Sequence, residues 1–265
     1  MITALRSKLA SWEWILAILT VLLLIGAITG NDSFWTAFNI QNSLSTMAEK
    51  SLLVLPLALL IIAREIDISV ASIAGLSAVT AGITLGNGGS VPVAVAVAVL
   101  TGATCGAING FFVAVLGLPA LVVTLGTLAL FRGLGYVLLG GTPISAIPPS
   151  LISFGNDPIP GTFLPWDILP FLVLAPFFVI ALQRMAIGRR IYALGAGPDT
   201  AKYSGVNGVR IKFVLFLMTG IICSIAGIIN IGKNSSASPD AAFGFELDAI
   251  TVVFLGGVSS LGGRG

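Results

Sequence analysis

Carboxylates beside apolar segments are the residues of this chain best suited to chemistry. Arg64-Glu65-Ile66-Asp67 stands between two apolar runs, and Glu246-Leu247-Asp248 opens a third. Charged side chains that border apolar segments are costly unless they face protein, water or one another. They therefore mark a pathway for a solute or a fixed structural pair. For the first cluster, an ordinary turn at a membrane surface, with Arg64 as its basic residue, is the alternative.

The chain lacks the residues that most enzyme mechanisms need. The chain has no histidine, which removes histidine zinc sites, Ser-His and Cys-His dyads and histidine proton relays. Cys105 and Cys223 lie in apolar stretches, where a thiol usually packs as a small side chain. The nearest match to a phosphate-binding loop, Gly227 to Asn234, lacks the Ser or Thr that holds magnesium and ends an apolar helix. We expect no catalytic residue, metal site or cofactor in this chain.

Composition places these residues in a membrane. The chain is 56% hydrophobic and 9% charged, with a mean hydropathy of +1.05, which leaves too little polar surface for a soluble globule. No charged residue stands between Asp67 and Arg132, and about 20 apolar residues span the hydrocarbon core as a helix, so that stretch must cross roughly three times. The apolar runs are continuous rather than alternating. An all-α, polytopic membrane protein is predicted.

Turn-forming residues divide the apolar sequence into about eight transmembrane helices. They are predicted at residues 14–29, 48–63, 68–85, 91–116, 118–139, 166–187 and 213–231, and from Ala249 onward. Glycine-rich and proline-rich breaks separate them, the longest from Pro143 to Pro165. The first span lacks a small-x-small cleavage site after it, so we interpret it as a retained helix rather than a signal peptide.

Basic residues predict the orientation, because cytoplasmic loops carry an excess of Lys and Arg. With a cytoplasmic N-terminus, Lys50 and Lys233 fall near the outside, whereas the inside holds Arg6, Lys8, Arg64, Arg184, Arg189, Arg190, Lys202, Arg210, Lys212 and Arg264. Arg132 lies deep in its predicted span. It either snorkels to the far interface or lines a pore.

Two segments indicate an internal repeat. Glu65-Ile66-Asp67 through Gly75 and Glu246-Leu247-Asp248 through Gly256 share an acid-apolar-acid start before a helix rich in small residues. Five predicted spans separate the copies, so they would face opposite sides of the membrane, as in an inverted repeat. We predict a single permease domain over residues 1–265 that holds about eight helices of a ten-helix, inverted-repeat protein, with halves at about 1–140 and 166–265, the second incomplete because the chain is C-terminally truncated. A chance match of a few positions is the alternative.

The most basic segment, residues 184–212, is predicted to be a cytoplasmic loop. Within it, Gly197-Pro198-Asp199-Thr200-Ala201-Lys202-Tyr203-Ser204-Gly205 has the pattern of a two-turn helix. Pro198 suits a first turn, Asp199 complements the positive end of the helix dipole, and Gly205 can adopt the left-handed stop. So short a helix needs a docking partner for stability. A solvated basic loop that only sets topology is the alternative.

Several motifs together support a family. They are Glu65-Ile66-Asp67-Ile68-Ser69-Val70-Ala71-Ser72, Gly106-Ala107-Ile108-Asn109-Gly110, the run from Pro119 to Leu128, Gly188-Arg189-Arg190-Ile191-Tyr192-Ala193-Leu194-Gly195, and the run from Val253 to Gly263. As a set, along essentially the whole chain, they resemble the monosaccharide permeases of ATP-binding cassette (ABC) importers for ribose, xylose, arabinose, rhamnose and autoinducer-2. The rhamnose-type permeases resemble it best.

The resemblance implies partners and a mechanism. A permease of this kind pairs with a second permease subunit, cytoplasmic ABC ATPase subunits that bind the ATP, and a periplasmic sugar-binding protein; membrane lipid surrounds it and no nucleic acid is expected. The residues from Gly197 to Gly205 would couple it to the ATPase. Alternating access would carry a monosaccharide along a polar path whose candidate residues are Glu65, Asp67, Ser69, Ser72, Asn109, Thr124, Thr127, Glu246 and Asp248.

Two other classes of function stay open from the sequence. A secondary transporter driven by protons or sodium would use Asp67, Glu65, Glu246 or Asp248 to bind the ion, and its uptake would survive loss of any ATPase. A membrane-embedded enzyme is disfavoured because the chain offers no convincing pair of nucleophile and base.

Overall fold

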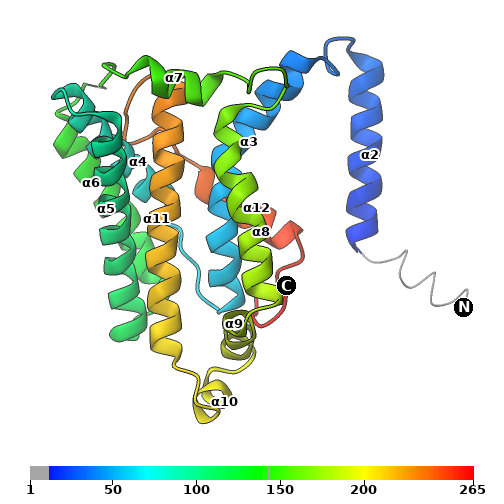
Figure 1. The fold of residues 1–265 in the computed structure, drawn as a ribbon. Coiled ribbons are helices and arrows are strands. Elements are labelled where there is room, and N and C mark those ends of the chain that lie inside the picture. The colour runs from blue at the N-terminus through cyan, green and yellow to red at the C-terminus, as the bar shows by residue number, and fades with distance from the viewer. Residues whose placement is uncertain (1–11, 143) are drawn as a thin grey trace, which may run out of the picture.

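The computed structural model describes residues 12–142 and 144–265, and side chains from Trp14 onward. Within these residues the chain is helical and has no strand beyond two isolated β-bridges, Ile144 with Ala237 and Pro158 with Pro165. Arg6 and Lys8 of the orientation argument, and Pro143 at the start of the proline-rich break, lie outside the described residues. The helices form one upright bundle, and α2 stands apart from it (Figure 1).

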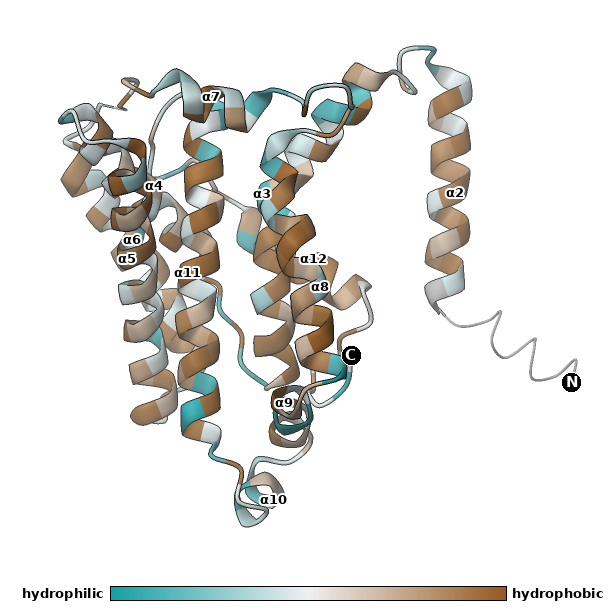
Figure 2. Cartoon of the chain, viewed as in Figure 1, coloured by the Kyte–Doolittle hydropathy of each residue, from teal (hydrophilic) through white to brown (hydrophobic). Residues whose placement is uncertain are grey.

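Apolar residues predominate in the long helices, as expected for membrane spans, and polar residues gather toward some helix ends (Figure 2). In chain order the elements are α2 (Trp12–Gly30), α3 (Ala37–Ile62), α4 (Val70–Gly86), α5 (Val91–Gly110), the π-helix η1 (Phe111–Val115), α6 (Ala120–Leu139), α7 (Pro149–Asn156), the 3₁₀-helix η2 (Trp166–Ile168), α8 (Leu169–Gln183), α9 (Ala186–Ala196), α10 (Pro198–Tyr203), α11 (Gly208–Asn234) and α12 (Phe245–Leu255).

Five helical segments of the described chain are long and apolar enough to cross a membrane. They are α3, α5 with η1, α6, η2 with α8, and α11. Two shorter apolar helices, α2 and α4, and the 11-residue α12 accompany them. The predicted multi-span, all-helical fold is confirmed at this level, whereas the predicted count of eight spans within a ten-helix protein stays a prediction.

One predicted boundary is wrong in a way that matters for function. The second span is predicted to start at Ala48, which puts Lys50 near the outer surface. The helix α3 instead begins at Ala37, where the Thr36 side chain accepts a hydrogen bond from the Asn39 amide. Residues 37–47 are too polar to register as a span, yet they continue the same helix. Lys50 consequently lies near the middle of α3.

Small residues allow the central helices to approach closely. A Cβ added to Gly102 on α5 would lie 2.2 Å from the Gly220 carbonyl oxygen on α11, and one added to Gly106 would lie 2.4 Å from that of Phe216. Close backbone packing of this kind is common where membrane helices meet at glycine. The α5–α11 pair, with α4 and α3 beside it, forms the centre of the bundle (Figure 1).

Two irregular segments enter the bundle from opposite ends. Residues 63–69 follow the end of α3 and rise to the start of α4, and residues 235–244 leave the other end of the bundle after α11 and descend to α12 (Figure 1). The second segment descends along α4. Ala237 lies beside Gly82, and Pro239 lies beside Gly75, two turns lower on α4. Both short helices thus begin inside the bundle.

Candidate functional sites

Three of the predicted pathway residues meet in one buried cluster at the start of α4. The Asp67 Oδ1 atom accepts hydrogen bonds from the Ser69 amide at 2.8 Å and from Ser69 Oγ at 2.6 Å, and Asn109 Nδ2 of α5 donates to Ser69 Oγ at 2.8 Å. All three side chains are fully enclosed. The cluster caps the entering segment and ties it to α5. Asp67 Oδ2 and Asn109 Oδ1 are buried without a hydrogen-bond partner.

Other predicted residues surround this cluster. Thr124 Oγ1 of α6 donates to the Ile66 carbonyl at 3.3 Å, and Thr127 Oγ1 donates to the Thr124 carbonyl at 3.4 Å. Ser72 is enclosed, and its hydroxyl has no hydrogen-bond partner. The sequence therefore identified hydroxyl and amide groups that do converge, from α4, α5 and α6. The folded chain covers them almost completely.

The predicted acids do not form one site. Glu65 is buried and pairs with Lys212 near the start of α11. Asp248 is half-exposed and pairs with Lys50 of α3 at 2.6 Å. Glu246, in the first turn of α12, is buried, and its Oε2 atom has no partner. Each acid consequently has its own environment.

Arg132 forms an ion pair with a carboxylate of the same chain. Its Nε atom lies 3.8 Å from Asp240 Oδ1, and its guanidinium carbon lies 4.8 Å from the centre of the Phe243 ring. Tyr136, one turn further along α6, donates a hydrogen bond to Asp240 Oδ2. The segment of residues 235–244, which enters the bundle, thus supplies the partner of Arg132, whose role the sequence left open.

Arg64 has a structural position at the end of the bundle that carries α9 and α10. It adopts a left-handed conformation, with φ of 66°, and its Nε donates to the Leu261 carbonyl at 2.7 Å. Beside it, the Gly263 amide donates to the Ile62 carbonyl at 2.8 Å. Arg64 therefore holds the residues after α12 against the end of α3.

The predicted short helix is confirmed as α10, at the outermost point of the same end of the bundle (Figure 1). Gly205 has φ of 77°, the left-handed stop that was expected there. Ala201 is buried, and its carbonyl accepts a hydrogen bond from the Val206 amide at 3.0 Å, which closes the helix onto the following chain. Tyr203 is 92% exposed. α10 thus presents an aromatic side chain to its surroundings.

Comparison with known proteins identifies the family. A model described as the permease component of the branched-chain amino acid transport system matches residues 39–264. This chain belongs to that permease family. It is 33% identical to the ribose import permease protein RbsC of Escherichia coli K12, over 98% of this chain and 81% of the relative. It is also 35% identical to the autoinducer 2 import system permease protein LsrC of Enterobacter sp. strain 638, over 94% of this chain and 72% of the relative.

The predicted resemblance to importer permeases is therefore confirmed. The sub-assignment to rhamnose-type permeases stays a prediction. No solved structure matches the chain significantly.

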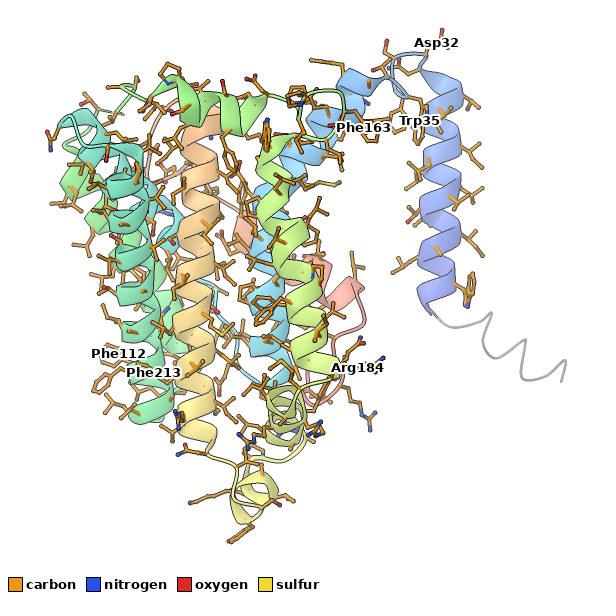
Figure 3. The ribbon with its side chains drawn as sticks, in the orientation of Figure 1. Asp32, Trp35, Phe112, Phe163, Arg184 and Phe213 are labelled. Atoms are coloured by element: carbon orange, nitrogen blue, oxygen red, sulfur yellow. The ribbon has the colours of Figure 1, made fainter. Side chains whose placement is uncertain are left out.

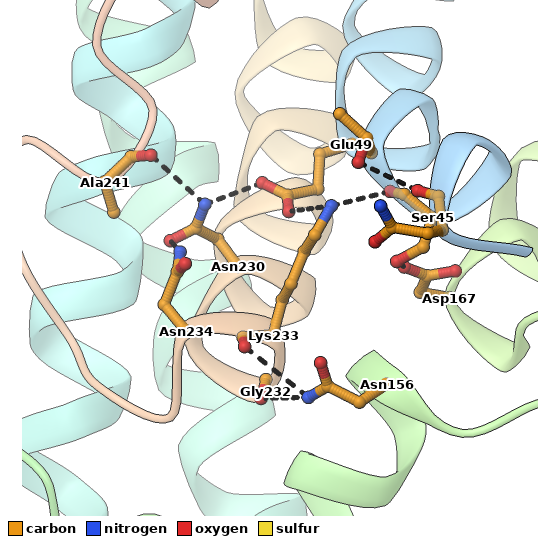
Figure 4. A network of polar contacts seen from close by, with 11 residues as sticks. Ser45, Glu49, Asn156, Asp167, Asn230, Gly232, Lys233, Asn234 and Ala241 are labelled. Atoms are coloured by element: carbon orange, nitrogen blue, oxygen red, sulfur yellow. Dashed lines mark hydrogen bonds and ion pairs between the residues drawn. The ribbon is translucent and has the colours of Figure 1, made fainter. Parts of the chain in front are cut away.

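The permease has a polar network that sequence reasoning missed (Figure 4). At its centre, Glu49 of α3 accepts a hydrogen bond from Asn230 Nδ2 of α11 at 2.7 Å and lies 3.7 Å from Lys233 Nζ. Lys233 also donates to the Ser45 carbonyl at 2.8 Å, and Ser45 Oγ donates to Asp167 Oδ2 of η2 at 2.6 Å. Glu49 and Asp167 are both buried.

This network fastens three helices of the permease at the end opposite α10. The wrong start of the second span hid it, because Ser45 and Glu49 stood at or outside the predicted edge. A usable signal was the pair Asn230 and Lys233, which lie on one face of α11 at a spacing of one turn. The apparent phosphate-loop match from Gly227 to Asn234 lies in these last turns of α11, so the segment is helix and not loop.

Proposed function

We propose that this chain is the membrane permease subunit of an ATP-driven importer that carries a monosaccharide, such as a pentose or a deoxyhexose, into the cytoplasm. The observation that carries this proposal is the 33% identity to a ribose import permease, which extends over 98% of the chain. The chain itself performs no catalysis. A cytoplasmic ABC ATPase would bind and hydrolyse the ATP, and a periplasmic binding protein would deliver the sugar.

The loop of residues 184–212 is the proposed contact with the ATPase. Its helix α10 is fixed at the base through Ala201 and is exposed at Tyr203, as a docking helix must be. An exposed helix shorter than two turns has little stability of its own, so a groove in a partner would hold it. Force applied there reaches the bundle through α9 on one side and α11 on the other.

The distribution of charge supports a cytoplasmic N-terminus in a bacterial inner membrane. Arg184 lies at the same end of the bundle as α9 and α10, whereas Asp32 lies at the opposite end (Figure 3). Cytoplasmic ends of membrane proteins carry the excess of basic residues. The first helix α2 would then leave the cytoplasm, and α10 would face it.

Alternating access is the proposed mechanism. The two segments that enter the bundle from opposite ends support an inverted repeat with halves at about residues 1–140 and 166–265. A second permease subunit completes the proposed path. The enclosed cluster around Asp67, Ser69 and Asn109 would belong to the closed side of this path, and α4 and α5, which it ties together, would move as one unit when the path opens.

An ion-driven transporter is less well supported. Two of the four acids that it would use, Glu65 and Asp248, already pair with lysines, so they are not free to bind an ion. The classes also differ in partners, since only the importer needs a cytoplasmic ATPase.

A co-purification from the native host tests the proposal. Tyr203→Ala removes the exposed ring of α10 without touching the buried Ala201, and Trp35→Ala, which removes an exposed ring near the opposite end, is the matched control. We expect the unmodified chain and the Trp35 variant to recover an ABC ATPase, and the Tyr203 variant to recover at least several-fold less. Absence of any ATPase from abundant, membrane-inserted chain would contradict the importer.

A further inference from the structure

We propose that one exposed face of the permease lines the water-filled route and contacts an uncharged, polyhydroxylated solute. This face, here called the polar wall, consists of Lys50, Arg132, Tyr136, Asp240, Phe243 and Asp248. The proposal rests on the proposed function and adds the residues that meet the sugar. Of the six, the sequence suggested only Asp248 as a pathway residue and Arg132 as a possible pore-lining residue.

The first argument is depth. Lys50 lies 13 residues after Ala37 and 12 before Ile62, so at about 1.5 Å per residue it is roughly 18 to 20 Å from either end of α3. Arg132 lies 12 residues after Ala120 and 7 before Leu139, roughly 18 and 10 Å from the ends of α6. Both helices are candidate membrane spans. Arg132 is therefore inside the membrane, whereas Lys50 lies nearer the end opposite α10, because its neighbour Glu49 contacts Lys233 in the last turn of α11.

The second argument is exposure. The side chains of Asp240 and Asp248, which pair with these cations, are 47% and 52% exposed. Half-exposed carboxylates at this depth are very costly against lipid tails, so charged residues within membrane spans face protein or a water-filled cavity. The described chain does not cover them. We therefore infer that both carboxylates border water.

The third argument is the chemistry of the wall. Its two bases and two acids form two pairs, Lys50 with Asp248 and Arg132 with Asp240, so their charges cancel. A neutral wall of this kind admits a neutral solute without favouring an ion. The Nε and Nη2 atoms of Arg132 are buried, so the groups of the wall that a sugar hydroxyl can reach are the half-exposed carboxylates of Asp240 and Asp248, which accept hydrogen bonds.

Aromatic rings complete the match to a sugar. Phe243 is 67% exposed and contacts the Arg132 guanidinium, and Tyr136 is 46% exposed and donates a hydrogen bond to Asp240. A ring offers a flat apolar surface for the C–H face of a sugar, while carboxylates accept hydrogen bonds from its hydroxyls. The segment from Asp240 to Asp248 carries both ion pairs, so the start of α12 would sense the bound solute.

Cysteine accessibility in native membranes tests the wall without knowledge of the sugar. A thiol placed at Phe243→Cys or Tyr136→Cys should react with a charged, membrane-impermeant methanethiosulfonate. Leu130→Cys is the control, because Leu130 is 52% exposed on α6, two residues before Arg132, on another side of the helix. The native Cys105 and Cys223 are buried, so the unmodified chain serves as the blank. We expect the two wall cysteines to react at least tenfold faster than Leu130→Cys.

Equal, slow reaction at all three positions would overturn the wall, whether lipid or a second subunit covers it. That outcome does not depend on transport. With ribose as the probe in the assembled transporter, Phe243→Leu should raise KM at least fivefold and lower kcat less, whereas Leu130→Ala should change neither. An unchanged KM would overturn the sugar contact. If the unmodified transporter carries no sugar in response to ATP, the proposed function fails, while the cysteine result still decides the wall.

Discussion

Residues 65–69 and residues 240–248 both lead from an end of the bundle to a short helix, α4 in one case and α12 in the other. Both contain two acids separated by one apolar residue, yet the environments of these acids differ. Asp67 is fully enclosed and accepts hydrogen bonds from Ser69, which in turn accepts one from Asn109 of α5, whereas Asp248 is half-exposed and paired with Lys50 of α3. We therefore propose that the first segment is fixed scaffold and that the second contacts the solute. Similar sequence patterns thus serve different purposes because different helices cover them.

The largest effect should come from Asp67→Ala. This change leaves two buried Ser69 donors without their acceptor, and each buried group left unpaired costs about 1–3 kcal/mol, so we expect a loss of about 3 kcal/mol in stability. Thermal unfolding in detergent measures it. Asp157→Ala, in an exposed loop, is the control and should change little. Equal stability of the two variants would show that the first segment is not fixed scaffold.

Glycines at matching positions of the two segments sharpen the comparison next. A Cβ on Gly75 would lie 2.3 Å from the Pro239 carbonyl oxygen, whereas one on Gly256 would meet only carbonyls of its own helix, at 3.3 and 3.4 Å. Gly75→Ala should therefore cost about 1–3 kcal/mol by overpacking. Gly256→Ala should be nearly neutral. The same unfolding assay compares them, and equal losses would refute the close contact between the second segment and α4.

Glu65→Gln should have a smaller effect. It removes the charge that pairs with Lys212, and a hydrogen bond to a charged group contributes about 1.5–3 kcal/mol when buried; with Lys212 partly exposed, we expect about 1 kcal/mol. The matched control is Arg210→Gln, since Arg210 is exposed two residues earlier and forms no ion pair with any described residue. A loss no greater than that of the control would mean that the first segment is not tied to α11.

Asp248→Asn should affect stability least and transport most. An exposed ion pair contributes about 0–1 kcal/mol, so unfolding should barely shift. The polar wall, however, would then carry an uncompensated Lys50, and uptake of a neutral sugar should fall several-fold. Measuring both quantities on one preparation separates the effects. A marked loss of stability with normal uptake would reverse the assignments of the two segments.

Sequence reasoning predicted the helical membrane fold, the convergence of Asp67, Ser69 and Asn109, and the position of α10. Those features depend on local patterns, namely apolar length, small residues and turn chemistry. It could not place Lys50, because the polar start of α3 resembles a loop in hydropathy. It also could not pair Arg132 with Asp240, since the partner lies more than a hundred residues away and enters from the opposite end of the bundle. Contacts between distant segments leave no local signal.

Reconstitution of the protein with its ATPase and binding protein tests the central claim most directly. Uptake of labelled ribose into proteoliposomes would be measured with ATP, with ATP and an ATPase unable to hydrolyse it, and with an imposed proton or sodium gradient alone. We predict uptake only with ATP and an active ATPase. Uptake that follows the ion gradient and persists with the inactive ATPase would contradict the importer.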